Sequence, residues 1–417
     1  MSILLVYVGL FAAGWFAVHL LRGRRRPRDF TSLKTVTFGD ESAIRPDRYA
    51  SFLSVLVIFL IWGAFTGSRL VPLHVPGPFL GDTSFSYTAQ DAEGGSDAAM
   101  VTIRVHPLDE RPEPRETAQD DSLAQDDTAS VAAWRSGFVN VLANDRGEDL
   151  RVTAVDDTAI APGEEVRVAH GTVAMTAKGS LTFMPDRGLQ MEPIWLPSPE
   201  AVVARFVQIA RDGYQNFTLW EHLGASLLRV LVGFLAGSAI GIPLGYAMGL
   251  SGWFRGWFDP IVEFMRPVPP LALIPLVIIW FGIWETGKIV LLFLAALWVM
   301  AISARAGVSG VNLTKIHAAY SLGASKWQIL RHVVVPNSLP EIFTGARVAM
   351  GVCWGTVVAA ELVAAQKGAG MMIIAASKFQ LTDIVITGIV LIGVIGYGID
   401  IMMRGAERYL VPWKGRS

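Results

Sequence analysis

Glu263, Arg266 and Glu361 are charged residues inside or at the edges of long apolar stretches, where an unpaired charge is costly. Glu263 and Arg266 stand three residues apart in PIVEFMRPVPPLALIPL, so they can pair on one face of a helix. That pair could be an interfacial ion pair or part of a gate, and the sequence leaves both open. Glu361 follows WGTVVAA, and its carboxylate could meet the ammonium group of a substrate or pair with Arg229 or Arg347.

The stretch GIWETGKI at 282–289 imitates the phosphate-binding loop G-x-x-x-x-G-K-[ST], but it ends on Ile289. A phosphate loop needs a hydroxyl there for magnesium and a strand before it, and the sequence offers neither. The sequence also has no His, Cys and carboxylate cluster with metal-ligand spacing and no catalytic triad pattern. We therefore expect no catalytic residue, no metal and no cofactor. If ATP drives this protein, a partner must hydrolyse it.

Small residues recur at spacing four in the apolar stretch 223–250. They are Gly233, Gly237, Gly241, Gly245 and Gly249. This spacing lets two membrane helices approach closely. We favour helix packing as their role, and the lining of a moving path is the alternative.

The stretch AAYSLGASKWQILRHVVVPNSLP at 318–340 is too polar for a membrane span and too strongly patterned for a loose loop. Its apolar residues fall on helix faces on both sides of Gly323, which predicts two short amphipathic helices hinged at that glycine. Pro336 is predicted to end the second helix, and Pro340 to precede the next span. Such a surface suits a groove on a partner protein. The alternative is a re-entrant loop that packs on its own bundle.

The elements that position these residues are predicted to be membrane helices. The chain has 417 residues, 52% of them hydrophobic, and a mean hydropathy of +0.43. A spanning helix needs about 20 mostly apolar residues. The stretches that qualify are 3–21, 49–66, 223–250, 261–281, 289–304, 342–365 and 384–403. We predict an all-α polytopic membrane bundle, and the net charge of −1 gives no reason to expect nucleic acid as a partner.

Lys and Arg in short loops set the orientation of such a bundle. Basic residues crowd the loop after the first apolar stretch, the loop at 305–331 and the C-terminus, which puts all three inside. Alternation then places residues from 67 to about 220 outside. The first stretch has no basic residue before it and a dense cluster after it. We therefore expect a retained anchor at 1–30, not a cleaved signal peptide, followed by a cytoplasmic loop at 31–48.

Residues 80–190 do not resemble a membrane segment. Apolar and polar residues alternate, as at Phe85, Tyr87 and Ala89, which predicts short half-buried strands. We expect an external all-β sandwich, cadherin-like or Ig-like. GDTSFSYTAQDAEGGSDAAMVTIRV and VNVLANDRGEDLRVTAV resemble cadherin-like repeats of bacterial surface proteins in inverted order, so the domain looks like a circularly permuted repeat. The acidic stretch 107–130 is typical of a flexible linker, with calcium binding by its Asp pairs as an alternative.

The 318–340 stretch resembles the E-A-A-x(3)-G-x(9)-I-x-L-P signature of permease subunits of binding-protein-dependent ABC importers. The matching positions are Ala318, Ala319, Gly323, Val333, Val335 and Pro336. His317 stands where the family has Glu. WLPSPEAV, TLWEHLGASLLRV, MGLS, DPIVEFMRPVPPLALIPLVIIWFGIWETGK, LVAAQKGAG and PWKG are similar to the nitrate/sulfonate/taurine branch of this family. The resemblance covers 49–66 and 195–417, but not the first anchor or the β domain.

The resemblance implies a function, a location and partners. It implies a permease subunit for taurine or a related small sulfonate, placed as a multi-pass protein in the bacterial inner membrane. It implies a homodimer that works with two cytoplasmic ABC ATPases and a periplasmic binding protein, surrounded by lipid. Residues 310–340 would be the cytoplasmic segment that couples to the ATPase. The residues expected to couple are Ala318, Ala319, Gly323, Ala324, Ser325, Lys326 and Pro336. Glu263, Arg266 and Glu361 become candidates for the translocation path or its gate.

The organisation that we expect has four main parts. After the anchor comes a first permease helix with its outer connection at 49–79, then the periplasmic β domain at 80–190 and the core permease domain at 191–417. Two alternatives remain open. The same permease could carry nitrate or another small organic anion, or the chain could be a membrane-anchored adhesin or sensor that acts through its β domain.

Overall fold

The computed structural model describes residues 48–110, 112, 122–147 and 149–413, with scattered positions among the first twenty. The predicted anchor at 1–30 and the predicted loop at 31–48 lie outside the described residues, apart from those positions and Arg48. The chain divides into two compact units, Met1–Glu200 and Ala201–Ser417, each with a hydrophobic core of its own.

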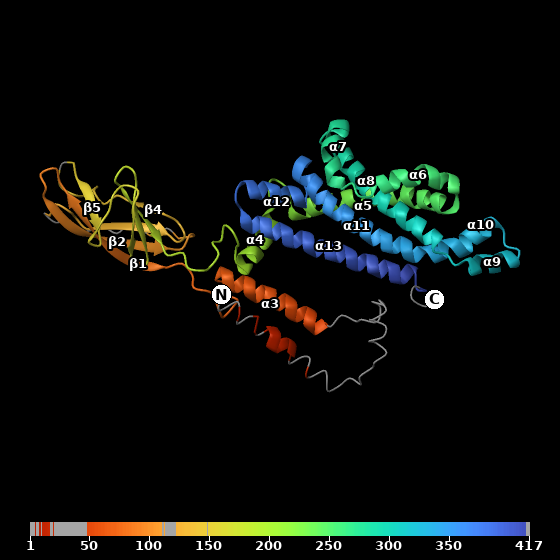
Figure 1. Cartoon of the computed structure of the whole chain (residues 1–417), viewed down its shortest axis with the longest axis horizontal. Coiled ribbons are helices and arrows are strands. Elements are labelled where there is room, and N and C mark those ends of the chain that lie inside the picture. The colour runs from red at the N-terminus through yellow and green to blue at the C-terminus, as the bar shows by residue number, and fades with distance from the viewer. Residues whose placement is uncertain are drawn as a thin grey trace. The chain divides into compact units, whose positions relative to one another are not determined.

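The first unit contains helix α3 (Arg48–Thr66), long and apolar enough to cross a membrane (Figure 1). After it, the chain enters and leaves a β domain at one place. The Phe79 backbone N–H donates to the Asp186 carbonyl at 2.9 Å, and the Phe79 ring stacks on His170 with centroids 4.0 Å apart. The domain is therefore a module that is connected to the rest of the chain through two adjacent segments.

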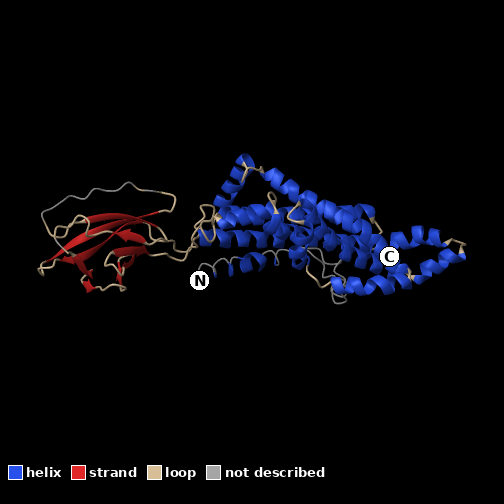
Figure 2. Cartoon of the chain, turned by 90° about the horizontal axis from the view of Figure 1, so that it is seen from above, coloured by secondary structure: helices blue, strands red, loops and turns tan. Residues whose placement is uncertain are grey.

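Two sheets make up the β domain, drawn in red in Figure 2. The five-stranded sheet has the order β3 (Asp127–Ala132), β2 (Ser96–His106), β1 (Gly81–Gln90), β5 (Arg151–Val155), β6 (Thr158–Ala159). The four-stranded sheet has the order β4 (Gly137–Val139), β9 (Leu181–Pro185), β8 (Gly171–Met175), β7 (Glu165–Val168). Most neighbours are antiparallel, and β2 pairs with β3 in parallel.

The alternation along the strands explains the core of the β domain. Phe85, Tyr87 and Ala89 point inward from β1 and are at most 3% exposed. Phe85 stacks on Phe183 of the opposite sheet with ring centroids 6.3 Å apart, so both sheets share one core. The strands β1, β2 and β5 lie in one sheet, as the circular-permutation hypothesis requires.

The acidic linker predicted at 107–130 is shorter than expected. Its last residues belong to β3, which pairs with β2 over six residue pairs from Asp127 to Ala132. The buried Val131 anchors this strand in the core. Composition alone could not reveal this, because the acidic Asp127 lies on the same inward side of β3 as Ala129 and Val131. Residues 111 and 113–121 of the predicted linker lie outside the described residues.

The second unit is helical, and its long helices run side by side in Figures 1 and 2. Its elements are α4 (Pro199–Asp212), α5 (Leu219–Leu250), α6 (Gly252–Met265), a 3-10 turn (Pro270–Leu273), α7 (Ile274–Phe281), α8 (Glu285–Ser309), α9 (Leu313–Ser321), α10 (Lys326–Ile329), a π-helical turn (Leu330–Val334), α11 (Val335–Ala364), α12 (Ala369–Lys378) and α13 (Thr382–Leu410). Residues from α5, α8 and α11 make up its main core.

Within the described residues, five helical stretches are long and apolar enough to span a membrane. They are Tyr49–Thr66, Leu219–Leu250, Glu285–Ser309, Lys326–Val363 and Thr382–Leu410. The span predicted at 261–281 is wrong as a single helix, because the chain bends by 92° between Gly252–Met265 and Pro270–Phe281. Pro267, Pro269 and Pro270 explain the break, since each lacks the N–H that would continue the helix.

The five glycines of the spacing-four pattern line the face of α5 that packs on α8. A Cβ added to Gly237 would lie 2.6 Å from the Cβ of Ala296, and one added to Gly241 would lie 2.7 Å from the carbonyl oxygen of Leu297. Gly233, Gly245 and Gly249 face Leu292, Ala301 and Val308 in the same way. Only a hydrogen side chain permits so close an approach of the two backbones.

Candidate functional site

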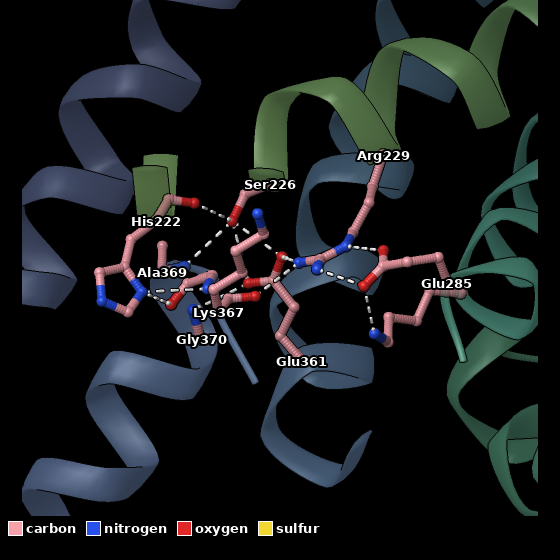
Figure 3. Close-up of polar contacts among 10 residues, drawn as sticks. His222, Ser226, Arg229, Glu285, Glu361, Lys367, Ala369 and Gly370 are labelled. Carbon is pink, nitrogen blue, oxygen red and sulfur yellow. Dashed lines mark hydrogen bonds and ion pairs between the residues drawn. The ribbon is translucent and has the colours of Figure 1, made fainter. Parts of the chain in front are cut away.

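A buried ion pair connects α5 to α11 (Figure 3). Arg229 of α5 and Glu361 of α11 are 3% and 1% exposed, and Arg229 Nη1 lies 2.6 Å from Glu361 Oε1. Of the two partners that the sequence offered for Glu361, the structure therefore has Arg229. Arg347 is engaged elsewhere, with Glu407 of α13.

Arg229 also binds a second carboxylate, that of Glu285 at the start of α8. Its Nε and Nη2 donate to the two Glu285 oxygens at 2.6 and 2.7 Å, and Lys288 Nζ donates to the same carboxylate at 2.9 Å. The four charges alternate in sign and cancel. This compensation is what a buried pair needs, because an isolated charge in an apolar interior is strongly unfavourable.

Neutral groups complete the shell around Glu361. The Ser226 hydroxyl donates to Oε1 at 2.8 Å, and the Gly370 backbone N–H donates to Oε2 at 3.0 Å. Gly368 has a φ of +145°, and a side chain there would run into the Glu361 carboxylate. Both oxygens of Glu361 thus already accept hydrogen bonds. Its role in binding substrate stays a prediction.

The turn between α11 and α12 is held by the same cluster. Arg229 Nη1 donates to the Lys367 carbonyl at 2.8 Å. The Gly368 N–H donates to His222 Nδ1 at 3.1 Å, so the proton of the imidazole belongs on Nε2, which lies 3.1 Å from the Tyr214 carbonyl. The cluster therefore fixes α5, α8, α11 and the start of α12 to one another at one end of the bundle.

Glu263 and Arg266, the other predicted pair, lie at the end of α6. Their charged atoms are 3.8 Å apart and both side chains are largely exposed. Glu263 makes a closer contact with Arg305 of α8, at 2.9 Å, and Arg305 also pairs with Asp259. This junction connects α6 to α8, and local sequence patterns do not reveal it because Arg305 is 42 residues away from Glu263.

The segment 310–340 contains the two predicted helices, α9 and α10, and the hinge between them. Gly323 has a φ of +77°, a conformation that favours glycine. The Ser325 hydroxyl accepts from the Gln328 N–H, and the Gln328 side chain accepts from the Ser325 N–H at 2.7 Å, which is a capping box that starts α10.

The prediction that Pro336 ends this helix is wrong. The helix continues through the π-helical turn into α11, so that Lys326–Val363 forms one stretch of 38 residues. Pro340 has no N–H for the carbonyl of Pro336, and the indole N–H of Trp413 donates to that carbonyl instead, at 3.1 Å. Asn337 Nδ2 donates to the Val333 carbonyl at 2.7 Å. Side chains thus supply donors next to the prolines.

The segment 310–340 has one face on the bundle and one face open. Ile316, Ala319 and Ala324 pack on a small core formed by Val308, Val311, Ile329 and Val334. The opposite face exposes the large apolar side chains of Leu313, Tyr320, Leu322 and Trp327, with Leu322 at 88%. Ala318, Gly323, Ser325 and Lys326, which the sequence assigned to ATPase coupling, are exposed as well, while Pro336 is half-buried.

Comparisons with known proteins identify the family. Residues 237–411 match the family model "Binding-protein-dependent transport system inner membrane component". The chain is 48% identical over 226 residues to the taurine transport system permease protein of Escherichia coli (strain K12), covering 54% of this chain and 82% of that relative. The chain belongs to this family of permeases.

A second relative of this permease is the putative aliphatic sulfonates transport permease protein of the same organism. It is 40% identical over 218 residues, covering 52% of this chain and 81% of the relative. A solved structure, the inward-facing MetNI methionine ABC transporter, matches with 21% identity and a TM-score of 0.41, covering 45% of this chain and 93% of that chain.

Membership in the family answers several of the sequence expectations. The chain is a multi-pass permease subunit of an inner-membrane importer and not an enzyme, and its ATPase and its binding protein are separate partners. The adhesin or sensor alternative does not describe the whole chain. His222, Ser226, Glu285 and Trp413 were not singled out from the sequence, although all four lie in stretches that resemble the branch, such as TLWEHLGASLLRV and PWKG.

Proposed function

We propose that this permease imports taurine or a related small sulfonate, as a homodimer that engages two ATPases and receives substrate from a periplasmic binding protein. The substrate assignment rests on the 48% identity to a taurine permease over 82% of that relative's length. The relative with 40% identity is an aliphatic-sulfonate permease, which supports the same substrate class.

The segment 310–340 is the proposed contact with the ATPase. Its open face combines a glycine hinge with exposed Leu313, Tyr320, Leu322 and Trp327. An amphipathic helix that presents such residues suits a hydrophobic groove on a partner. The core beneath this face holds the segment to the bundle, so that a displacement of α9 and α10 reaches the rest of the unit.

The unbroken helix from Lys326 to Val363 is the proposed mechanical link. It joins α10 at one end to Glu361 at the other, and Glu361 fixes α11 to α5 and α8 through Arg229. When the ATPases close, movement of α10 is passed along this helix to the cluster, whose rearrangement changes access to the path. Glu263 and Arg266, next to the break between α6 and α7, are the proposed inner gate.

The β domain is proposed to lie in the periplasm and to help dock the binding protein. The positive-inside pattern places 67 to about 220 outside, which is the side on which a binding protein delivers substrate. The remaining surface of the helical unit, where α5 and α13 expose many apolar side chains, is proposed to contact lipid and the second permease subunit.

Uptake measurements test this function. We would measure uptake of labelled taurine in cells that produce the chain with its ATPase and binding protein, with unlabelled alkanesulfonates and nitrate as competitors. Saturable taurine uptake that alkanesulfonates inhibit is the expected result. If nitrate alone inhibits uptake, nitrate takes the place of taurine as the proposed substrate. Gly323→Arg should abolish uptake, because it places a bulky charge on the hinge, while Gly256→Arg at an open position serves as its control.

A further inference from the structure

The β domain contains a cavity that no function described above uses. It lies at the end of the sandwich where β5 begins and the hairpin between β8 and β9 turns, and its volume is about 570 Å³. Small-molecule sites in proteins have volumes of roughly 300–1,000 Å³. The cavity is therefore large enough for an organic ligand.

Side chains of the domain's own core form the inner wall of this cavity, and they come from both sheets. They are Val139, Val141, Val152, Ile160, Met175 and Leu181. These side chains are at most 7% exposed, and Leu142, Leu150 and Pro162 add more accessible apolar surface to the lining. An apolar body in the cavity would cover this surface against water.

The mouth of the cavity carries positive charge. Arg151 and Lys178 both line it and are both exposed. Among the lining residues that the structure describes there is no Asp or Glu. Among the lining residues, an anion at the mouth would meet two cations, which attract it and repel a cation.

Both cations stand on hydrogen-bonded backbone. Arg151 starts β5 and pairs with Gln90 of β1. Lys178 occupies the β8–β9 hairpin, which is closed by the bond from the Thr176 N–H to the Ser180 carbonyl at 2.8 Å and by Gly179 at a φ of +81°. The charged groups therefore stand on rigid elements on two different sheets.

We propose that this cavity binds an anionic amphiphile, with its alkyl chain against the apolar lining and its head group near Arg151 and Lys178. The proposal concerns the β domain alone and does not depend on which substrate the permease carries. An alkanesulfonate and a fatty acid share this chemistry, so the experiment includes a probe for each.

The test uses the full-length chain in nanodiscs of zwitterionic lipid, with empty nanodiscs to subtract partition into lipid. Equilibrium dialysis with labelled octanesulfonate and octanoate should show saturable binding of one anion per chain. Along the series from butanesulfonate to octanesulfonate, affinity should rise about fourfold per methylene group, as expected for an alkyl chain that is buried. The ratio of the affinity for octanesulfonate to that for octanoate distinguishes an alkanesulfonate ligand from a fatty acid.

Variants locate the binding. Arg151→Gln with Lys178→Gln should weaken octanesulfonate binding at least tenfold, while Arg104→Gln with Arg187→Gln removes two exposed cations elsewhere on the domain and should leave it unchanged. Hydrogen exchange should slow at 150–153 and 176–181 when octanesulfonate is added. Hydrogen exchange also verifies that each variant keeps its sheets, because the amides of the other strands should exchange at unchanged rates.

Three outcomes would overturn the proposal. Binding equal to that of empty nanodiscs would show that the cavity takes no anionic amphiphile. If the folded variant Arg151→Gln with Lys178→Gln binds octanesulfonate as tightly as the original chain, the two cations have no role in binding. Equally tight binding of octyltrimethylammonium would show that the site does not select for negative charge.

Discussion

Arg229 binds two carboxylates at once, one in the protein interior and one at the surface. Glu361 is 1% exposed, whereas the side chain of Glu285 is 57% exposed. The consequences of removing the arginine are therefore unequal for the two. Glu285 would keep water and Lys288, but Glu361 would be left as a charge in an apolar interior.

Arg229→Met should strongly destabilise the helical unit for this reason. Breaking a buried ion pair by removing one partner costs roughly 3–5 kcal/mol. The measurement is thermal unfolding of the chain in nanodiscs. Adding Glu361→Gln to the same chain removes the stranded charge and should restore most of the loss. A single variant as stable as the original chain would argue against the ion pair as the structural link between α5 and α11.

Asp127 in the β domain should make stability depend on pH. Burial and the nearby Asp145 carboxylate raise the pKa of Asp127 from 3.8 to about 7. The folded domain therefore holds this proton more tightly than the unfolded chain does. The resulting stabilisation is fully present below about pH 4 and is lost as the pH rises through 7.

Hydrogen exchange of the amides in β1 and β2 measures this effect. At each pH the exchange of the Asp127→Asn variant is compared with that of the original chain, so that the intrinsic pH dependence of exchange cancels. Because Asn stays neutral, the original chain should lose protection relative to the variant between pH 4.5 and 7. A ratio independent of pH would contradict the raised pKa.

At the scale of elements, the contact between α5 and α8 depends on glycines at chosen positions. Gly237→Ala should destabilise the bundle by about 1–3 kcal/mol, because the new methyl group meets the Cβ of Ala296 and the helices must separate. Gly224 in the same helix has open space around it, so Gly224→Ala should be neutral or slightly stabilising. Unfolding in nanodiscs compares the two, and similar effects would count against close packing.

The junction between α10 and α11 depends on a side chain near the C-terminus. Trp413→Phe keeps an aromatic ring but removes the N–H that binds the Pro336 carbonyl. One such hydrogen bond contributes about 0.5–1.5 kcal/mol. Amides in Leu330–Val334 should therefore exchange up to about tenfold faster, and uptake should fall. Trp253→Phe, with an exposed ring on α6, is the control, and equal exchange in both variants would disprove the role of Trp413.

The two proline clusters show what the sequence can and cannot predict. Apolar length was enough to locate the long helices, and the small residues around Gly323 were enough to locate the hinge. Prolines at 267–270 break a helix, whereas Pro336 and Pro340 do not. At Pro336, the indole N–H of Trp413, 77 residues away in the chain, binds the carbonyl that Pro340 leaves without a backbone donor. Local patterns carry no information about such partners. For Glu361 the sequence offered Arg229 and Arg347 without deciding between them, and the pair with Arg229 spans 132 residues.

At the scale of the whole molecule, the β domain can be removed without cutting the helical unit. Replacing residues 82–184 with a short glycine-containing turn should leave the chain able to fold and to bind its ATPase, because Phe79 and Asp186 are already hydrogen-bonded neighbours. If the domain helps dock the binding protein, the affinity for that protein and the rate of uptake should fall. ATPase co-purification reports folding, and unchanged affinity with unchanged uptake would refute the docking role.

The closeness of Phe79 and Asp186 also bears on how such a protein can arise. A module that leaves and rejoins the chain at adjacent residues can be gained or lost in one recombination event, without altering the order or the contacts of the permease helices. Natural selection can then act on the module by itself. Relatives with and without it can share the same transport machinery and differ only in what they recognise outside it.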